Sequence, residues 1–229
     1  MLTLSIDVMT KESCVALWKS DKSIQKHQKF IKKMSDNGNS EIIFEAIEEL
    51  FSKSTYKINE IDRVITINGP GNYTNIRIGL AVAKGFSIAL DIPYFAISSH
   101  ELIANLAIKK NISNELLVLI DAKNDSFYTQ YFNINQNSKT EIILESFESI
   151  KKQIKNKQIN IIERDIAFLT LCISNNYSPA LLESNVEIPE FLLAEIGSKL
   201  EINNTNVDPL YIRQPNAKVP ENVKIYKNE

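Results

Sequence analysis

The chain has 229 residues, of which 44% are apolar and 24% charged, and this is the composition of a globular protein large enough to bury a core. Its formal net charge of −2 excludes a protein that holds nucleic acid through a broad basic surface. Cys14 and Cys172 lie in separate apolar runs, as buried thiols in a reducing compartment do. The sequence has no basic leader followed by a long apolar stretch, and no apolar run reaches the roughly 20 residues of a membrane span. We therefore expect a cytoplasmic protein that has no membrane partner.

Strands and helices alternate through the first half of the chain. Runs that are apolar, or that alternate between apolar and polar residues, predict strands, and apolar residues at helical spacing predict helices. The expected strands cover residues 2–6, 14–18, 24–30, 63–67 and 94–97, and the expected helices cover 41–52, 75–90 and 99–108. A polar break at 109–114 is the best candidate for a boundary, so we expect one lobe over residues 1–110 and a second over 111–229.

The second half repeats this pattern more weakly. The expected strands cover residues 116–120, 126–132, 140–144 and 159–162, and a helix is expected at 188–200. Apart from the strand at 159–162, the segment 147–184 gives no clear signal. Strands followed by helices in two successive halves indicate an α/β architecture with two related lobes.

Few residues of this chain could carry chemistry by themselves. The two histidines, His27 and His100, are far apart and belong to no HxxxH, HExxH or Cys/His cluster, so we expect no metal site. The GxSxG pattern of a nucleophile elbow is missing from the sequence, and no cysteine–histidine pattern typical of catalysis is present. We therefore expect no self-sufficient catalytic residue and no cofactor.

A loop after the fourth expected strand could hold a phosphate group. Gly69 and Gly71 stand between a strand and a helix, where backbone N–H groups bind anions, and Thr74 follows them. The chain has neither GxxxxGK[ST] nor GxGxxG, and the proline between the two glycines removes one donor. The alternative is a tight turn that only positions the helix. Asp7, at the end of the first strand, is likewise either a structural residue or the remnant of a ligand site.

The helix expected at 75–90 is apolar nearly all round, and a helix of this kind must be buried on most sides. Small residues stand four apart on two of its faces, with Gly79 and Ala83 on one and Ala81, Gly85 and Ala89 on the other. A single lobe has difficulty covering such a helix, so we infer a protein–protein interface; the alternative is a fully internal core helix. The partner-binding residues that we expect are Ile76, Gly79, Leu80, Ala83 and Phe86.

The loop and the start of this helix also carry a motif. Residues 69–79 read GPGNYTNIRIG, which resembles the GPGSFTGxRIG signature of the TsaB (YeaZ) family. Three further segments resemble that family in the same order along the chain. They are the hairpin at 4–17, the strand pair at 119–128 with IDAK in place of the family's IDAR, and the closing PLYIR at 209–213.

The resemblance implies an actin-like ATPase fold of the ribonuclease-H type, with mixed sheets and flanking helices in two related lobes. It implies a non-catalytic subunit in the synthesis of N6-threonylcarbamoyladenosine (t6A) in tRNA, which binds and supports a TsaD-type transferase. A TsaE-type ATPase joins that complex, tRNA is reached indirectly, and the same helix can pair two copies of the chain in a homodimer. The competing hypothesis is a stand-alone actin-like ATPase or small-molecule kinase, which would hold its nucleotide at Asp7 and the 69–71 loop.

Overall fold

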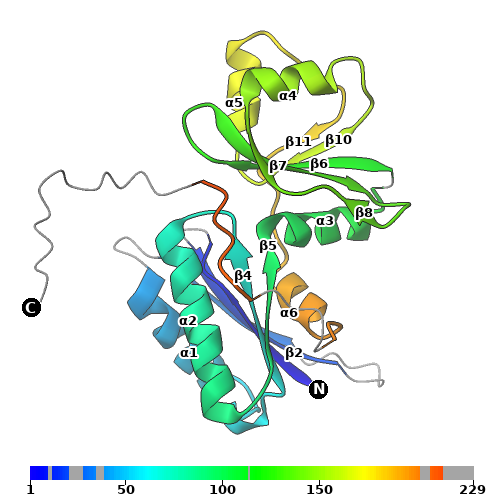
Figure 1. Ribbon diagram of the computed structural model, residues 1–229. Helices are drawn as coiled ribbons and strands as arrows, with labels where there is room; N and C mark the ends of the chain where they lie inside the picture. The colour runs from blue at the N-terminus through cyan, green and yellow to red at the C-terminus, as the bar shows by residue number, and fades with distance from the viewer. Residues whose placement is uncertain (10–11, 21–27, 35–38, 113, 202–206, 214–229) are drawn as a thin grey trace, which may run out of the picture.

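The structure is a computed structural model that describes residues 1–9, 12–20, 28–34, 39–112, 114–201 and 207–213. Figure 1 shows two lobes, one above the other, each built around a sheet. This arrangement confirms the α/β fold with mixed sheets and flanking helices that the sequence predicts. Among the helices of these residues, none combines the length and the apolar character that crossing a bilayer requires.

The first sheet has five strands in the order β3-β2-β1-β4-β5. They are β1 Leu2–Asp7, β2 Glu12–Lys19, β3 Gln28–Met34, β4 Arg63–Gly69 and β5 Tyr94–Ser98. β1 pairs antiparallel with β2, its neighbour in the sequence, and parallel with β4, which follows after a helix. The part of the third expected strand before Gln28 lies outside the described residues.

The helices of the first lobe are α1 Asn39–Ser52, α2 Tyr73–Leu90 and α3 Ser99–Lys109, with a short 3-10 helix at Ile58–Glu60. α3 begins where the sequence predicts, because Ser98 and Glu101 form a capping box. The Ser98 hydroxyl accepts the N–H of Glu101 at 3.0 Å, and the Glu101 carboxylate accepts the N–H of Ser98 at 2.8 Å. α2 begins at Tyr73 rather than Asn75, because the side chain of Asn72 accepts the N–H of Asn75 at 3.1 Å and so caps the helix.

The second sheet repeats the pairing of the first. Its strands are β6 Glu115–Asp121, β7 Ser126–Asn133, β8 Ser138–Lys139, β9 Ile143–Ser146, β10 Asn160–Glu163 and β11 Leu182–Glu183. As β1 does in the first sheet, β6 pairs antiparallel with the next strand and parallel with a later one, β10. The segment 147–184 forms α4 Phe147–Ile154, β10, α5 Ala167–Ser174 and β11, and β10 confirms the strand expected at 159–162. The strand expected at 140–144 is replaced by β8 and β9, which both pair with β7.

The chain returns to the first lobe after β11. α6, Leu192–Gly197, is shorter than the helix expected at 188–200, and it packs against β1 and β4. The guanidinium of Arg63 in β4 donates to the carbonyl oxygens of Gly197 at 2.9 Å and Leu200 at 2.7 Å, which holds the end of this helix in place. Residues that the sequence assigns to the second lobe therefore help to complete the first.

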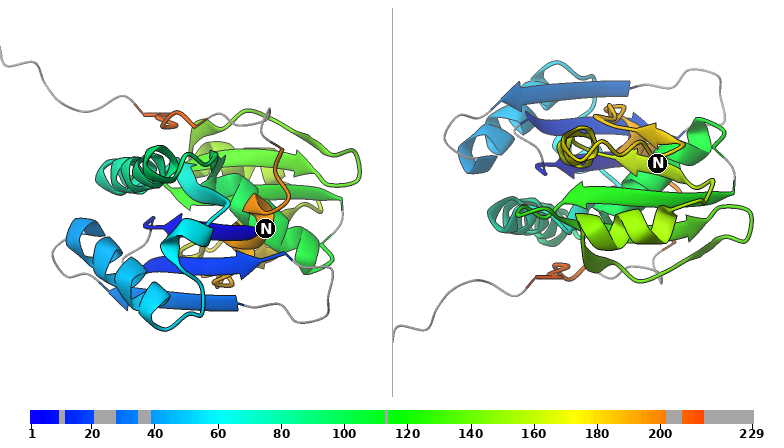
Figure 2. Two further views of the ribbon diagram at one scale, coloured as in Figure 1. Left: turned by 90° about the horizontal axis from the view of Figure 1, so that it is seen from below. Right: turned by 90° about the horizontal axis from the view of Figure 1, so that it is seen from above.

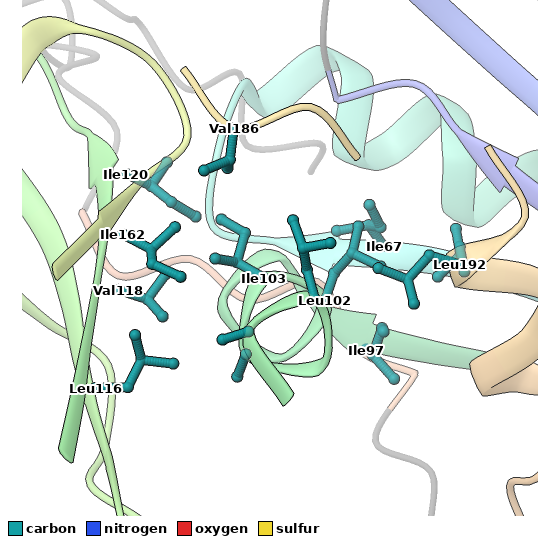
Figure 3. Packing of buried hydrophobic residues seen from close by; sticks show 14 of the residues in the cluster. Ile67, Ile97, Leu102, Ile103, Leu116, Val118, Ile120, Ile162, Val186 and Leu192 are labelled. Atoms are coloured by element: carbon teal, nitrogen blue, oxygen red, sulfur yellow. The ribbon is translucent and has the colours of Figure 1, made fainter. Parts of the chain in front are cut away.

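The two lobes share one hydrophobic core. α1 and α2 lie side by side on one face of the first sheet, and α6 lies on the opposite face together with α3 (Figures 1 and 2). α3 fills the space between the two sheets, while α4 and α5 cover the far face of the second sheet. Figure 3 shows Leu102 and Ile103 of α3 between side chains of both sheets, with Ile67 and Ile97 on one side and Leu116, Val118 and Ile162 on the other. The lobes are thus packed against each other through α3.

Candidate functional site

The loop after β4 is shaped by two glycines that pack against distant parts of the chain. Gly69 has a φ of +114°, and a Cβ there would lie 2.9 Å from the carbonyl oxygen of Leu210, so glycine fits this position without strain and other residues do not. A Cβ on Gly71 would overlap the end of the Met9 side chain. Thr74 is exposed in the first turn of α2. Met9 occupies the space beside Gly71. The packing therefore favours a tight turn that positions α2, rather than a loop that binds phosphate.

Asp7 is held by contacts within the chain. Its Oδ1 accepts the N–H of Met9 at 2.9 Å, and its Oδ2 lies 3.6 Å from Nη2 of Arg164. Arg164 follows β10 in the second lobe, and only 9% of its side chain is exposed, so the ion pair joins the two lobes in a place that water screens poorly. The negative charge of Asp7 is therefore neutralised by a residue of the chain itself.

Asp121 takes the corresponding position in the second lobe, at the end of β6. Its Oδ1 accepts the N–H of Lys123 at 2.7 Å, and its Oδ2 pairs with the Lys123 ammonium group. This hydrogen bond and the charge of Asp121 raise the pKa of Lys123. In both lobes, then, an aspartate at the end of the first strand accepts the N–H of the second residue beyond it and closes the turn.

One of the two small-residue faces of α2 is turned towards the first sheet. Ile76, Leu80 and Ala83 are at most 9% exposed and belong to the cores of this lobe, and Gly79 is buried against β4. These four residues, which the sequence predicts to bind a partner, are therefore not accessible to one in the folded chain. Phe86 is half-buried and does reach the surface. The reason is that the helix packs on its own sheet through the face that carries Gly79 and Ala83.

The other small-residue face of α2 forms a surface groove together with α1. The groove has a volume of about 420 Å³, and every residue that lines it is apolar. The lining residues are Phe44 of α1 and Ile78, Ala81, Val82, Gly85, Phe86 and Ala89 of α2. Phe44 is 60% exposed, which is unusual for a large aromatic side chain. This groove, which gathers apolar side chains of α1 and α2 at the surface, is the candidate functional site.

His100 lies in the shared core rather than at a binding site. Its Nε2 is 3.0 Å from the carbonyl oxygen of Tyr128 and so carries the proton, while its Nδ1 has no partner among the described residues. Burial lowers the pKa of His100 to about 4, so the ring is neutral at physiological pH. His27 lies outside the described residues. The part of the chain that the structure covers brings no three histidine, cysteine or acidic side chains together as metal ligands.

Comparisons with known proteins agree with the motif. The family described as TsaD, tRNA N6-adenosine threonylcarbamoyltransferase, matches residues 25–183. A relative from Buchnera aphidicola subsp. Acyrthosiphon pisum, named tRNA threonylcarbamoyladenosine biosynthesis protein TsaB, is 28% identical over 226 residues, which cover 92% of this chain and 97% of the relative. The TsaB protein of Haemophilus influenzae is 24% identical, and the match covers 92% of each chain. The chain belongs to the TsaB (YeaZ) family.

A solved structure has the same fold. YeaZ from Pseudomonas aeruginosa matches with a TM-score of 0.69 at 18% sequence identity, over 92% of this chain and 99% of that chain. The likeness confirms the overall fold, in which two lobes are each built around a sheet.

The departures from the TsaB motif are accommodated by the local structure. Asn72 replaces the serine of the family motif and caps α2 as a serine would. Asn75 replaces the glycine of the motif and lies within the first turn of the helix. Tyr73 stands at the family's phenylalanine, and its ring stacks on that of Tyr211 with the centroids 4.7 Å apart. The motif at 69–79 and the closing segment at 209–213 thus meet at the N-terminal end of α2, a contact that the sequence alone does not reveal.

Proposed function

We propose that this chain is a non-catalytic subunit in the synthesis of t6A in tRNA, and that it binds and supports a TsaD-type transferase through the apolar groove of α1 and α2. The TsaB relatives are named for the biosynthesis of threonylcarbamoyladenosine in tRNA, and their similarity to this chain supports a role in the same pathway. A TsaE-type ATPase would join the same complex. Contact with tRNA would be made mainly through the transferase, and the site of action would be the cytoplasm, where tRNA is modified.

The main support for this proposal is Gly85, which lines the groove. Gly85 lies in the interior of α2, and a Cβ added there would meet nothing within 4 Å. The fold therefore gains nothing from glycine at this position, although glycine costs a helix interior about 1 kcal/mol relative to alanine. A glycine in an exposed helix allows another backbone to approach closely, and its neighbours Ala81 and Ala89 extend the same low ridge. A helix of a partner protein fits this surface.

A second copy of the chain is the competing occupant of the groove. Because Gly85 and its neighbours lie on the surface of each copy, two grooves can face one another in a symmetric homodimer. We expect such a dimer only when the transferase is absent, since both would use the same residues.

The contacts of Asp7 weigh against a stand-alone ATPase or small-molecule kinase. A nucleotide with its metal at Asp7 would have to displace Arg164 from a shielded ion pair and Met9 from the space beside Gly71. The core that runs from one sheet to the other through α3 would also resist the opening of a cleft between the lobes. These contacts support a subunit whose two lobes form a rigid body.

A binding experiment with one matched control tests the proposal. Ala81→Arg places a charged side chain in the groove, and Ala180→Arg makes the same change at an exposed position in the second lobe. We expect Ala81→Arg to weaken binding to a TsaD-type transferase by at least about 30-fold, the effect of losing an interface hot spot, and to reduce t6A formation in the reconstituted reaction. Ala180→Arg should behave as the unmodified chain does. Equal affinity for both variants, with both folded by circular dichroism, would remove the groove from the interface.

A further inference from the structure

Residues 207–213 form a strap that is fastened to both lobes. The N–H of Leu210 donates to the carbonyl oxygen of Asn68 at 2.8 Å, and the side chain of Asn68 donates to the carbonyl oxygen of Asp208 at 3.1 Å. The guanidinium of Arg213 donates to the carbonyl oxygen of Ala122 in the second lobe at 2.9 Å. In Figure 1 the strap is the red segment that passes over β4 near the start of α2. Hydrogen bonds within the chain therefore fix the backbone of the strap before any partner binds.

Tyr211 of the strap is presented at the surface in a stack with two residues of α2. Its ring lies on that of Tyr73, and the guanidinium of Arg77 lies 4.0 Å from the centre of the Tyr73 ring on α2. The Nε of Arg77 donates to the hydroxyl of Tyr211 at 3.0 Å, and another of its nitrogens donates to the hydroxyl of Tyr73. Tyr73 and Tyr211 are still 42% and 41% exposed. We name Tyr73, Arg77 and Tyr211 the aromatic cluster.

The aromatic cluster continues the groove along one ridge of α2. Residues four apart on a helix are neighbours on its surface, and the row Tyr73, Arg77, Ala81, Gly85 and Ala89 is exposed throughout. The last three of these line the groove. A partner helix lying in the groove would therefore meet the aromatic cluster at the N-terminal end of α2.

The positive charge of α2 is not balanced by carboxylates of the described residues. Arg77 and Lys84 are the two charged residues of α2, both are exposed, and neither is paired with a carboxylate in the part of the chain that the structure describes. A partner surface that carries an acidic residue beside an apolar stripe would complement this arrangement. Tyrosine and arginine are also the residues that most often dominate protein interfaces, and a seated strap loses little conformational entropy on binding.

We propose that the strap is part of the docking surface for the transferase, with the aromatic cluster receiving an acidic side chain of that partner while the groove receives its apolar residues. This inference rests on the proposed function, because it extends the same surface. It makes the last described segment of the chain a second anchor of the complex, in addition to α2.

The test measures the affinity of the transferase for variants of the full chain. Tyr211→Ala should weaken binding by about 10-fold to 30-fold, and Tyr211→Phe, which keeps the stacked ring, should lose much less. Arg77→Gln should weaken binding and should also reduce its dependence on salt concentration, because the pair with the acidic residue is lost. Slow hydrogen exchange at the N–H of Leu210 in each variant would show that the strap has stayed in place.

The outcomes separate this inference from the proposed function. If Ala81→Arg abolishes binding while Tyr211→Ala and Arg77→Gln leave it unchanged, the strap is not part of the interface. If Ala81→Arg also binds normally, the groove itself is not the docking site and the proposed function fails with it. If the cluster variants keep their affinity for the transferase but the assembled complex loses affinity for tRNA, the cluster contacts RNA, and the proposal of a protein partner is overturned.

Discussion

Replacing Gly85 with alanine should make the isolated chain more stable. Gly85 lies in the interior of α2, and the Cβ of an alanine would meet nothing within 4 Å. Alanine is favoured over glycine in a helix interior by about 1 kcal/mol, so the free energy of unfolding should rise by about that amount and Tm by roughly 3 °C in a chain of this size. Urea denaturation followed by circular dichroism measures the first quantity and calorimetry the second.

The same substitution at Gly79 of the same helix should have the opposite sign. A Cβ at Gly79 would lie 2.8 Å from Oγ1 of Thr66 and 3.1 Å from Cγ2 of Val8. The hydroxyl of Thr66 cannot move away without losing its hydrogen bond to the carbonyl oxygen of Ile6, which measures 2.8 Å. Overpacking of this kind costs about 1–3 kcal/mol, which exceeds the gain in helix propensity, so the variant should be less stable by up to about 2 kcal/mol.

The two alanine variants should also differ in binding. The new methyl group of Gly85→Ala projects into the groove, so affinity for the transferase should fall by about tenfold even though the isolated chain is more stable. A shift of stability in the same direction for both variants would refute the assignment of the buried and exposed faces of α2. Higher stability of Gly85→Ala with unchanged affinity would show that this glycine does not serve the close approach of a partner.

Four further substitutions test individual contacts. Burial lowers the pKa of His100 from 6.5 in the unfolded chain to about 4, so the unfolded state binds more protons between these values. Unfolding free energy should therefore fall by about 3 kcal/mol as the pH drops through that window, and urea titrations of His100→Gln should lack this part of the slope. Arg164→Gln leaves Asp7 without its cation and should lower the unfolding free energy by about 2 kcal/mol. If the stability losses of Arg164→Gln and Asp7→Asn simply add in the double variant, the two side chains do not form a direct ion pair. Gly69→Ala should lower stability by about 2 kcal/mol because of its positive φ and the nearby carbonyl of Leu210, and an unchanged Tm would argue against that conformation.

The order of motifs along the chain was enough to predict the fold, because each motif belongs to one strand or to one turn between neighbouring elements. The sequence also shows that α2 has two faces of small residues. It does not show which face packs on the sheet, because that depends on how the helix crosses the strands beneath it. The face of α2 that carries Gly79 and Ala83 is buried on the sheet, and the sequence alone does not reveal this.

Contacts between distant segments could not be predicted from local patterns. The partner of Asp7 is Arg164 of the other lobe, and nothing around either residue indicates the pair. Likewise the strap residue Leu210 explains why glycine is required at position 69, whereas the sequence left open whether the loop binds phosphate or only positions the helix. Phe44 did leave a signal, since it is a large apolar residue that falls outside the buried stripe of α1 formed by Ile43, Ile47 and Leu50.

The position of α6 has a consequence for the synthesis of the protein. The five strands of the first sheet are complete once residue 98 has left the ribosome, but the helix that packs on Ile65, through Gly197, is translated about a hundred residues later. Until then the nascent first lobe exposes an apolar face, which is the kind of surface that chaperones bind and that aggregates. A fragment of residues 1–110 should accordingly fail to behave as an independent domain, even though it contains every strand of its own sheet.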